Sequence, residues 1–265
     1  AWYIANNHSD INSAYFSKLG DDDLSDKMLK FMSDNRVDTT HVKKVSGSTI
    51  GLYLISLVNG ERTFSYWRNN SAATLLGQNI NDVEHAVKKQ DMIYFSGITL
   101  AILDPSSRNN LFSCLKSARC AGKKIAFDPN LRPKLWSDKK EMCDVIMAGA
   151  NLSDIILPSF DDEATWFSDA NPMATLKRYQ KVGAEIVVVK NAGEPVSFIS
   201  NQGIGTHPVQ SIGTVVDSTA AGDSFNSEIL VGVLRKIPLS EAISNGVNLA
   251  KRVIMGHGAL IKSDI

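Results

Sequence analysis

Residues Asp217–Phe225 read DSTAAGDSF, and this stretch decides how the rest of the chain is interpreted. It follows a β-rich apolar run ending at residues 214–216 and leads into residues 226–234, where apolar side chains have helical spacing. The small residues 220–222 leave the backbone bare where that helix begins. N–H groups at a helix start lack partners within the helix and carry the positive end of its dipole, so they can hold an anion. The stretch therefore predicts an anion site at the amino end of a helix.

Asp223 stands at the mouth of this predicted anion site. A carboxylate repels a phosphate beside it, so its presence there suggests a catalytic role. The natural role is that of a general base, which takes a proton from a hydroxyl group that attacks the phosphorus. A second interpretation needs no chemistry: Asp217 or Asp223 caps the helix, and the small residues allow tight packing. The spacing alone does not decide between the two interpretations.

The same stretch closely resembles the C-terminal signature of the ribokinase-like (PfkB) carbohydrate kinases, which usually reads DTxGAGDxF. The resemblance implies that Asp223 is the catalytic base and that Ala220, Ala221 and Gly222 supply the anion hole. Alanine stands at position 220, where many members have glycine. Alanine is harmless there if the backbone is in an ordinary helical or β region, and it is strained if φ is positive.

Composition limits the classes of function. A chain of 265 residues with 43% hydrophobic content can bury a full core, and its length suits one α/β domain over residues 1–265. The formal net charge is zero, which disfavours nucleic-acid binding. Cys114, Cys120 and Cys143 are widely spaced, so we expect reduced thiols in a cytoplasmic protein. No apolar run is long enough to span a bilayer and no signal peptide leads the chain, so no membrane partner is expected.

Apolar runs alternate with segments of helical spacing along the chain. The predicted strands are 13–19, 91–95, 124–127, 154–157, 185–190, 196–199 and 203–207. The predicted helices are 1–7, 24–35, 105–121, 142–148, 163–167, 173–181, 222–234 and 239–255. Continuous apolar strands separated by helices are typical of a mostly parallel central sheet with helices on both faces. The ribokinase-like resemblance implies the same α/β fold.

Residues 42–68 have a period of two instead. Segments 51–58 and 61–68 flank Asn59-Gly60, a pair that suits a two-residue type I′ turn, so a hairpin is predicted. A β-rich insertion does not easily join a parallel sheet, and we expect a small separate one. In the family this sheet is the lid over the sugar site, at about residues 42–68. Its exposed edge suits pairing with a second subunit, so a homodimer or higher homo-oligomer is expected.

Two further runs bear on the substrate, FSYWRNNSAA at 64–73 and FDPNLRPKLW at 127–136. The second follows a strand, and ligands of open α/β sheets sit at the carboxyl ends of strands. Arg68 and Arg132 each offer a planar fork of donors that suits a carboxylate. The alternatives are a solvated strand-end charge for Arg68 and a loop charge packed on Trp136 for Arg132.

Together with SGITLAIL at 96–103, these runs resemble the branch of the family that acts on the sugar acid 2-dehydro-3-deoxygluconate. The resemblance implies that Tyr66, Arg68 and Arg132 bind the substrate, with Asn130 and either Gly97 or Ile98 nearby. The implied reaction is ATP-dependent phosphorylation of the 6-hydroxyl. Two alternatives stay open: a neutral-sugar (fructose or ribose) or nucleoside kinase of the same family, and a non-catalytic sugar-binding relative.

The family resemblance also covers the nucleotide. It implies that Lys190, Gly193, Ser218, Gly222 and Asn248 contact ATP. Phosphoryl transfer needs a divalent ion on the phosphate oxygens, so Mg²⁺ is expected, bound through water.

The chain departs from the family at two places. The Gly-Gly-Asp-x-x-Asn run that binds substrate hydroxyls is not found before Ala1, so a strand, a loop and part of a helix are expected to be absent. In PSFDDEATW, residues 158–166, Glu163 matches the glutamate of the family's Asn-x-x-Glu motif, but Phe160 holds the asparagine position. Metal placement is therefore expected to depend on Glu163, together with Asp162. The alternative for Glu163 is an ordinary acid in the first turn of a helix.

Overall fold

The computed structural model describes residues 1–58, 61–210 and 215–262, with only the backbone described at 55–58 and 61–64. A six-stranded sheet forms its centre, in the order β10-β9-β8-β7-β6-β5. Strands β5 to β8 are mutually parallel, and β9 and β10 complete the sheet in antiparallel fashion. Their bounds are β5 Met92–Ser96, β6 Lys124–Asp128, β7 Ile155–Ile156, β8 Ile186–Val189, β9 Val196–Ser200 and β10 Gly203–His207.

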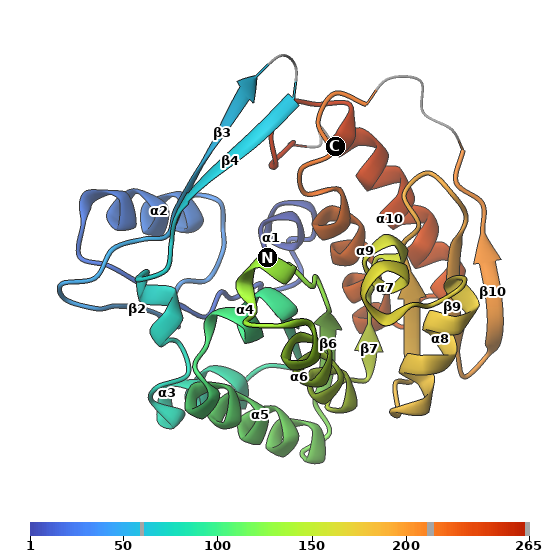
Figure 1. Ribbon diagram of the computed structural model, residues 1–265, viewed down its shortest axis with the longest axis horizontal. Coiled ribbons are helices and arrows are strands. Elements are labelled where there is room, and N and C mark those ends of the chain that lie inside the picture. The colour runs from blue at the N-terminus through green and yellow to red at the C-terminus, as the bar shows by residue number, and fades with distance from the viewer. Residues whose placement is uncertain (59–60, 211–214, 263–265) are drawn as a thin grey trace.

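Helices cover both faces of this sheet (Figure 1). Alternate residues of a strand point to opposite faces. On β6, Ile125 and Phe127 pack in one hydrophobic core and Ala126 packs in the other. The first core includes α3 Ile80–Lys88, α4 Gly97–Ile102, α5 Pro105–Cys120, α6 Lys139–Asn151 and α8 Pro172–Lys181. The second includes α1 Trp2–Asn7, α9 Ala221–Arg235 and α10 Leu239–Ile254. The α/β fold predicted from the sequence is confirmed.

The predicted hairpin forms a separate sheet that stands clear of the layered body (Figure 1). Strand β3, Leu52–Val58, pairs antiparallel with β4, Glu61–Trp67. The predicted Asn59-Gly60 turn lies outside the described residues.

Residues 42–68 do not form one small sheet, as expected, because residues 42–44 do not pair with the hairpin. Strand β2, Val42–Lys44, pairs in parallel with β1, Ser17–Leu19, as a second small sheet. Helix α2, Asp23–Asp34, lies between the two strands in sequence. Parallel neighbours need such a crossover.

The pattern did not predict the 3₁₀ helices Ala72–Leu75 and Pro133–Leu135. Among the α-helices of the described residues it missed two, α3 and α4, and most other bounds differ from prediction by three residues or fewer. Both missed helices are short, and polar side chains begin them: Asn79 accepts from the Asn81 N–H, and Ser96 accepts from the Ile98 N–H. The predicted strand 13–19 shortens to 17–19. Helices α7, Phe160–Phe167, and α6 begin three residues earlier than expected. No helix within the described ranges has the length and hydrophobicity that crossing a membrane requires.

Candidate active site

Three elements of the central sheet bring polar side chains to its carboxyl edge. Asp128 ends β6, Lys190 directly follows β8, and Tyr94 lies near the end of β5. The amino end of α9 meets them there, because Asn226 of α9 bonds to both Asp128 and Tyr94. In an open α/β sheet this edge is where ligands bind.

Helix α9 starts without a side chain to cap it. Its N-cap is Ala220, with φ 62° and ψ 12°, and no side-chain hydrogen bond closes the first turn. Asp217 lies outside the helix and accepts from the N–H groups of Thr219 at 2.9 Å and Gly258 at 3.1 Å. The first-turn amides of α9 therefore carry no capping carboxylate. The capping interpretation of Asp217 and Asp223 fails for α9, and the left-handed backbone puts Ala220 in the strained case.

Asp223 lies in the first turn of α9 with its side chain exposed. Surrounding protein desolvates the carboxyl, and this is the main reason why its pKa is raised; the negative charge of Asp128 is the second reason. The positive charges of Lys190 and Arg132 act in the opposite direction. A carboxylate with a raised pKa is a better proton acceptor. The Arg132 guanidinium therefore lies within electrostatic range of the expected base.

Lys190 sits at the centre of the polar cluster. Its ammonium donates to Asp128 Oδ2 at 3.1 Å, to the Leu157 carbonyl at 2.6 Å and to Asn226 Oδ1 at 3.0 Å. A side chain at Gly222 would lie 3.9 Å from the Lys190 nitrogen. The sequence predicts Lys190 as a nucleotide ligand, and the structure places its charge beside the first turn of α9.

The loop after β6 has an unusual backbone. Asn130 has φ 33° and Arg132 has φ 45°, both in the region that favours glycine. The Asn130 N–H donates to Asp128 Oδ1 at 3.1 Å, which holds the start of the loop. A Cβ on Gly97 would lie 1.7 Å from the Pro129 carbonyl oxygen, so α4 begins in direct contact with the loop. Gly97, Asn130 and Arg132, predicted to lie together, are therefore brought together.

Trp136 does not hold Arg132. The indole N–H of Trp136 donates to the Leu131 carbonyl at 2.7 Å, and the guanidinium over its ring, at 5.6 Å, belongs to Arg108. Arg132 is instead exposed and acts on Asp223 and Asp162. The packing alternative for Arg132 is wrong.

On the hairpin, Tyr66 and Arg68 form one group. The Arg68 guanidinium lies 4.3 Å from the centre of the Tyr66 ring. Tyr53 is the cross-strand partner of Tyr66, and their ring centres are 6.3 Å apart. Tyr53 therefore lies on the hairpin face that carries both predicted substrate residues. Its place there is set by the register between β3 and β4. The structure shows this group at the base of β4.

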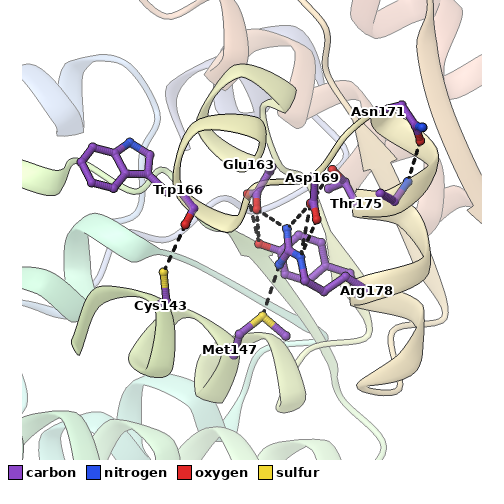
Figure 2. A network of polar contacts seen from close by, with 10 residues as sticks. Cys143, Met147, Glu163, Trp166, Asp169, Asn171, Thr175 and Arg178 are labelled. Carbon is purple, nitrogen blue, oxygen red and sulfur yellow. Dashed lines mark hydrogen bonds and ion pairs between the residues drawn. The ribbon is translucent and has the colours of Figure 1, made fainter. Parts of the chain in front are cut away.

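The structure contradicts a metal role for Glu163, whose side chain is fully buried. Its oxygens accept from Arg178 at 2.5 Å and from the Tyr179 hydroxyl at 3.0 and 3.1 Å. Arg178 also pairs with Asp169 at 2.6 Å, so one guanidinium serves two carboxylates (Figure 2). Burial raises the pKa of Glu163 to about 7. Glu163 holds α7 against α8, and its oxygens are buried against Arg178 and Tyr179, away from solvent and metal-bound water.

Asp162, one residue earlier, faces the site instead. It is half-buried. Desolvation raises its pKa, and the charge of Arg132 and the backbone of Leu131, in the loop after β6, oppose that rise. Consecutive helical residues point about 100° apart, so one residue separates the buried network from the open site. Of the two acids, Asp162 is the one near Arg132 and Asp128.

The remaining predicted nucleotide residues lie in three separate segments of the chain. Gly193 is exposed in the turn between β8 and β9, with open space where a side chain would stand. Ser218 is exposed just before α9, and its carbonyl accepts from the Ala221 N–H at 3.3 Å. Asn248 on α10 is exposed and lines a cavity of about 450 Å³ together with Asn7, His8, Glu228 and Asn245. Asp223 is not among the described residues that line this cavity.

A family model described as pfkB family carbohydrate kinase matches residues 2–264. The chain belongs to the pfkB family of carbohydrate kinases. It is 38% identical to the 2-dehydro-3-deoxygluconokinase of Haemophilus influenzae over 258 residues, which cover 95% of this chain and 82% of that protein. It is 34% identical to the Escherichia coli K12 protein of the same name over 253 residues, covering 93% of this chain and 82% of that one.

Solved structures share the fold of this pfkB family member. The TM-score is 0.84 with the 2-dehydro-3-deoxygluconokinase of Thermotoga maritima, at 20% identity over 98% of this chain and 84% of that one. It is 0.85 with a putative ribokinase II from E. coli in complex with ATP and Mg²⁺, at 19% identity over 97% of this chain and 81% of that one. At these identities the likeness establishes the fold.

Sequence reasoning assigned no individual role to four residues of the site: Tyr53, Tyr94, Asp128 and Asn226. Asp128 lies in the FDPNLRP run and Asn226 directly follows DSTAAGDSF, so both stand inside or beside recognised motifs. Their polarity within otherwise apolar segments was the available signal. A polar residue that is buried needs a partner, and here the partners come from other elements, far away in the sequence.

Proposed function

We propose that this chain is an ATP-dependent kinase that phosphorylates the 6-hydroxyl of 2-dehydro-3-deoxy-D-gluconate, giving 2-dehydro-3-deoxy-6-phosphogluconate. The observation that carries the proposal is that Asp128 bonds both to Asn226 of α9, the helix that carries Asp223, and to Asn130 in the loop that carries Arg132. An acidic substrate needs a cation to hold its carboxylate, and phosphorylation of an alcohol needs a base. The names of the two relatives above support the same substrate.

In the proposed reaction, Asp223 takes the proton of the 6-hydroxyl. The oxygen then forms a bond to the γ-phosphorus of ATP, while the bond from that phosphorus to the β–γ bridging oxygen breaks and ADP leaves. The backbone of Ala220, Ala221 and Gly222 faces the charge on the migrating group, because the first turn of α9 has no side-chain cap. The transferred phosphoryl group thus lies between the helix amides and the acceptor.

The substrate is proposed to lie between the loop after β6 and the hairpin. Arg132 binds its carboxylate in a forked geometry, and Asn130 bonds to its hydroxyls. Tyr66 and Arg68 contact it from the hairpin, already stacked on each other at 4.3 Å. The proposed lid role of the hairpin follows from that contact.

For the nucleotide, Gly193, Ser218, Gly222 and Asn248 are proposed contacts, and Mg²⁺ is the proposed ion. In the described ranges no group of three His, Cys, Asp or Glu side chains could hold a metal. This suits an ion held mainly by phosphate oxygens and water, the usual arrangement for Mg²⁺. Asp162 is the half-buried carboxylate that could hold one such water. When bound, the ion would neutralise charge on the phosphates.

A homodimer formed through the hairpin is also proposed. One hairpin face carries Tyr53 and Tyr66, and the other carries Leu52, Leu54 and Trp67. Leu54 is 54% exposed and Trp67 is 61% exposed. A second copy of the chain is the proposed cover for this apolar face.

The three cysteines are free, which supports the cytoplasm as the proposed compartment.

An ADP-release assay over a panel of acceptors tests the proposal. The panel holds 2-dehydro-3-deoxygluconate, fructose, ribose and adenosine. We expect the sugar acid to be preferred, and we expect Arg132→Ala to lower its kcat/KM by roughly 30- to 100-fold, since a charged hydrogen-bonding partner is lost. Lys134→Ala, which removes an exposed charge two residues away, should change little. Equal use of fructose or adenosine by the unaltered protein would contradict the proposal.

A further inference from the structure

Lys190 has no donor left for a ligand. An ammonium group has three N–H donors. The Asp128 carboxylate, the Leu157 carbonyl and the Asn226 amide oxygen accept from it at 3.1, 2.6 and 3.0 Å. The Lys190 side chain is only 12% exposed, and that of Asp128 is 8% exposed. A direct bond from Lys190 to a nucleotide phosphate would break one of these three bonds.

The partners of Lys190 are equally committed. Asn226, which is 1% exposed, donates to Asp128 Oδ2 at 2.7 Å and to the Tyr94 hydroxyl at 3.3 Å. Asp128 uses its other oxygen to accept the Asn130 N–H at 3.1 Å. The cluster therefore joins the ends of strands β5, β6 and β8 to α9 and to the loop that carries Arg132.

We infer that Asp128, Lys190 and Asn226 form a buried positioning cluster that holds a fixed positive charge beside the first turn of α9 and ties that turn to the Asn130–Arg132 loop. The inference rests on the proposed phosphoryl transfer by Asp223. Lys190 acts through Asp223 and the α9 amides without touching ATP, and Asp128 fixes both Lys190 and the substrate loop. The same positioning cluster therefore holds both the phosphoryl site at α9 and the substrate loop in place.

Several charged groups face Asp223, from each element packed around it. They are Asp128 from β6, Lys190 from the end of β8 and Arg132 from the loop after β6. The hydroxyls of Tyr3, Tyr15 and Tyr94 lie within the field of Asp223. Lys190 and Asp128 act on Asp223 with opposite signs. Removing one charge or the other must therefore move the titration of Asp223 in opposite directions.

The pH dependence of kcat/KM tests the inference. Asp223 must be unprotonated to act as a base, so activity is lost as the pH falls through its pKa. Lys190→Met removes a charge that lowers this pKa, so the acidic limb of the pH profile of kcat/KM should move to higher pH. Asp128→Asn removes a charge that raises it, so the limb should move to lower pH. In the double variant Lys190→Met/Asp128→Asn the limb should return toward the position of the unaltered protein.

Binding of ATP, measured by calorimetry, separates positioning from direct contact. We expect the dissociation constant of ATP to change less than threefold in the double variant. A loss of tenfold or more, or acid limbs that move in the same direction in both single variants, would overturn the inference. If Lys190→Met does not fold because Asp128 is left unpaired, Asp128→Asn and the double variant still decide the outcome.

A matched control and the choice of acceptor complete the design. Lys124→Met removes an exposed lysine at the opposite end of β6, paired with Glu185, and should shift neither limb nor ATP binding. The profiles are recorded with whichever acceptor the unaltered protein uses. Which acceptor works tests the proposed function, and the direction of the shifts tests the positioning cluster.

Discussion

Ala220 is a single residue at which the chain carries measurable strain. Its φ of 62° is favourable for glycine and costs about 1–2 kcal/mol for alanine. Ala220→Gly should therefore raise the free energy of unfolding by about 0.5–1 kcal/mol after the entropy of the added glycine is subtracted. Urea denaturation measures the change. Ala221→Gly, one residue later and inside α9, should lower stability by a similar amount, because glycine disfavours helix. A loss of stability in both Ala220→Gly and Ala221→Gly would contradict the claim that the backbone at Ala220 is strained.

Glu163 gives a second prediction for a single residue. Its pKa of about 7 in the folded protein lies above its ordinary value of 4.5, so the folded state binds the extra proton between these values. The stability from that proton is complete below the lower value and is lost as the pH rises through the higher one. Glu163→Gln does not titrate, and it should lose about 1–3 kcal/mol less between pH 5 and pH 8 than the unaltered protein.

Urea unfolding at the two pH values measures this slope. Glu185→Gln is the matched control, because Glu185 is an exposed acid in a surface ion pair. It should keep the slope of the unaltered protein. The same slope in Glu163→Gln would show that the buried carboxyl stays ionised throughout the range.

At the scale of elements, α4 begins in close contact with the loop after β6. A Cβ at position 97 would meet the Pro129 oxygen at 1.7 Å and the Ile146 side chain at 2.7 Å, so the backbone must move. Gly97→Ala should displace the loop that carries Arg132 and lower kcat/KM for the acceptor at least tenfold, since small misplacements are costly in catalysis. The dissociation constant of ATP, measured by calorimetry, should change much less. If kcat/KM for the acceptor and the affinity for ATP fell by the same factor, the substitution would be acting through general misfolding.

Elements also show how far sequence patterns extend. The buried strands were predictable because both faces of a central parallel sheet are covered, which leaves continuous apolar runs such as that of β8. Helix α4 was missed because it has six residues and begins at a glycine. The pattern placed the start of α7 at residue 163 and not at Phe160, so it could not show that Glu163 is buried while Asp162 is only half-buried.

The site was predictable only in part for the same kind of reason. Asp223 and Arg132 lie in motifs, whereas the bonds among Asp128, Lys190 and Asn226 join residues up to 98 positions apart. No local period reports such a contact. The backbone of Ala220 likewise depends on how α9 meets the preceding loop.

For the whole molecule, the exposed hairpin face predicts the state of assembly. Trp67→Glu places a charge on the apolar face and should convert the proposed dimer to a monomer, measured by light scattering after size exclusion. Phe31→Glu is a matched control on α2, where an apolar side chain is similarly exposed at 46%. It should leave the assembly unchanged. A monomer already present in the unaltered protein at high concentration would contradict the proposed interface.

The most direct measurement of the whole account is turnover by Asp223→Asn together with its affinity for ATP. Asparagine keeps the size of the side chain and cannot accept the proton, so the rate should fall by a factor on the order of 10²–10⁴. Binding of ATP should stay within a few-fold of that of the unaltered protein. A variant that retains most of its rate would contradict the assignment of Asp223 as the base.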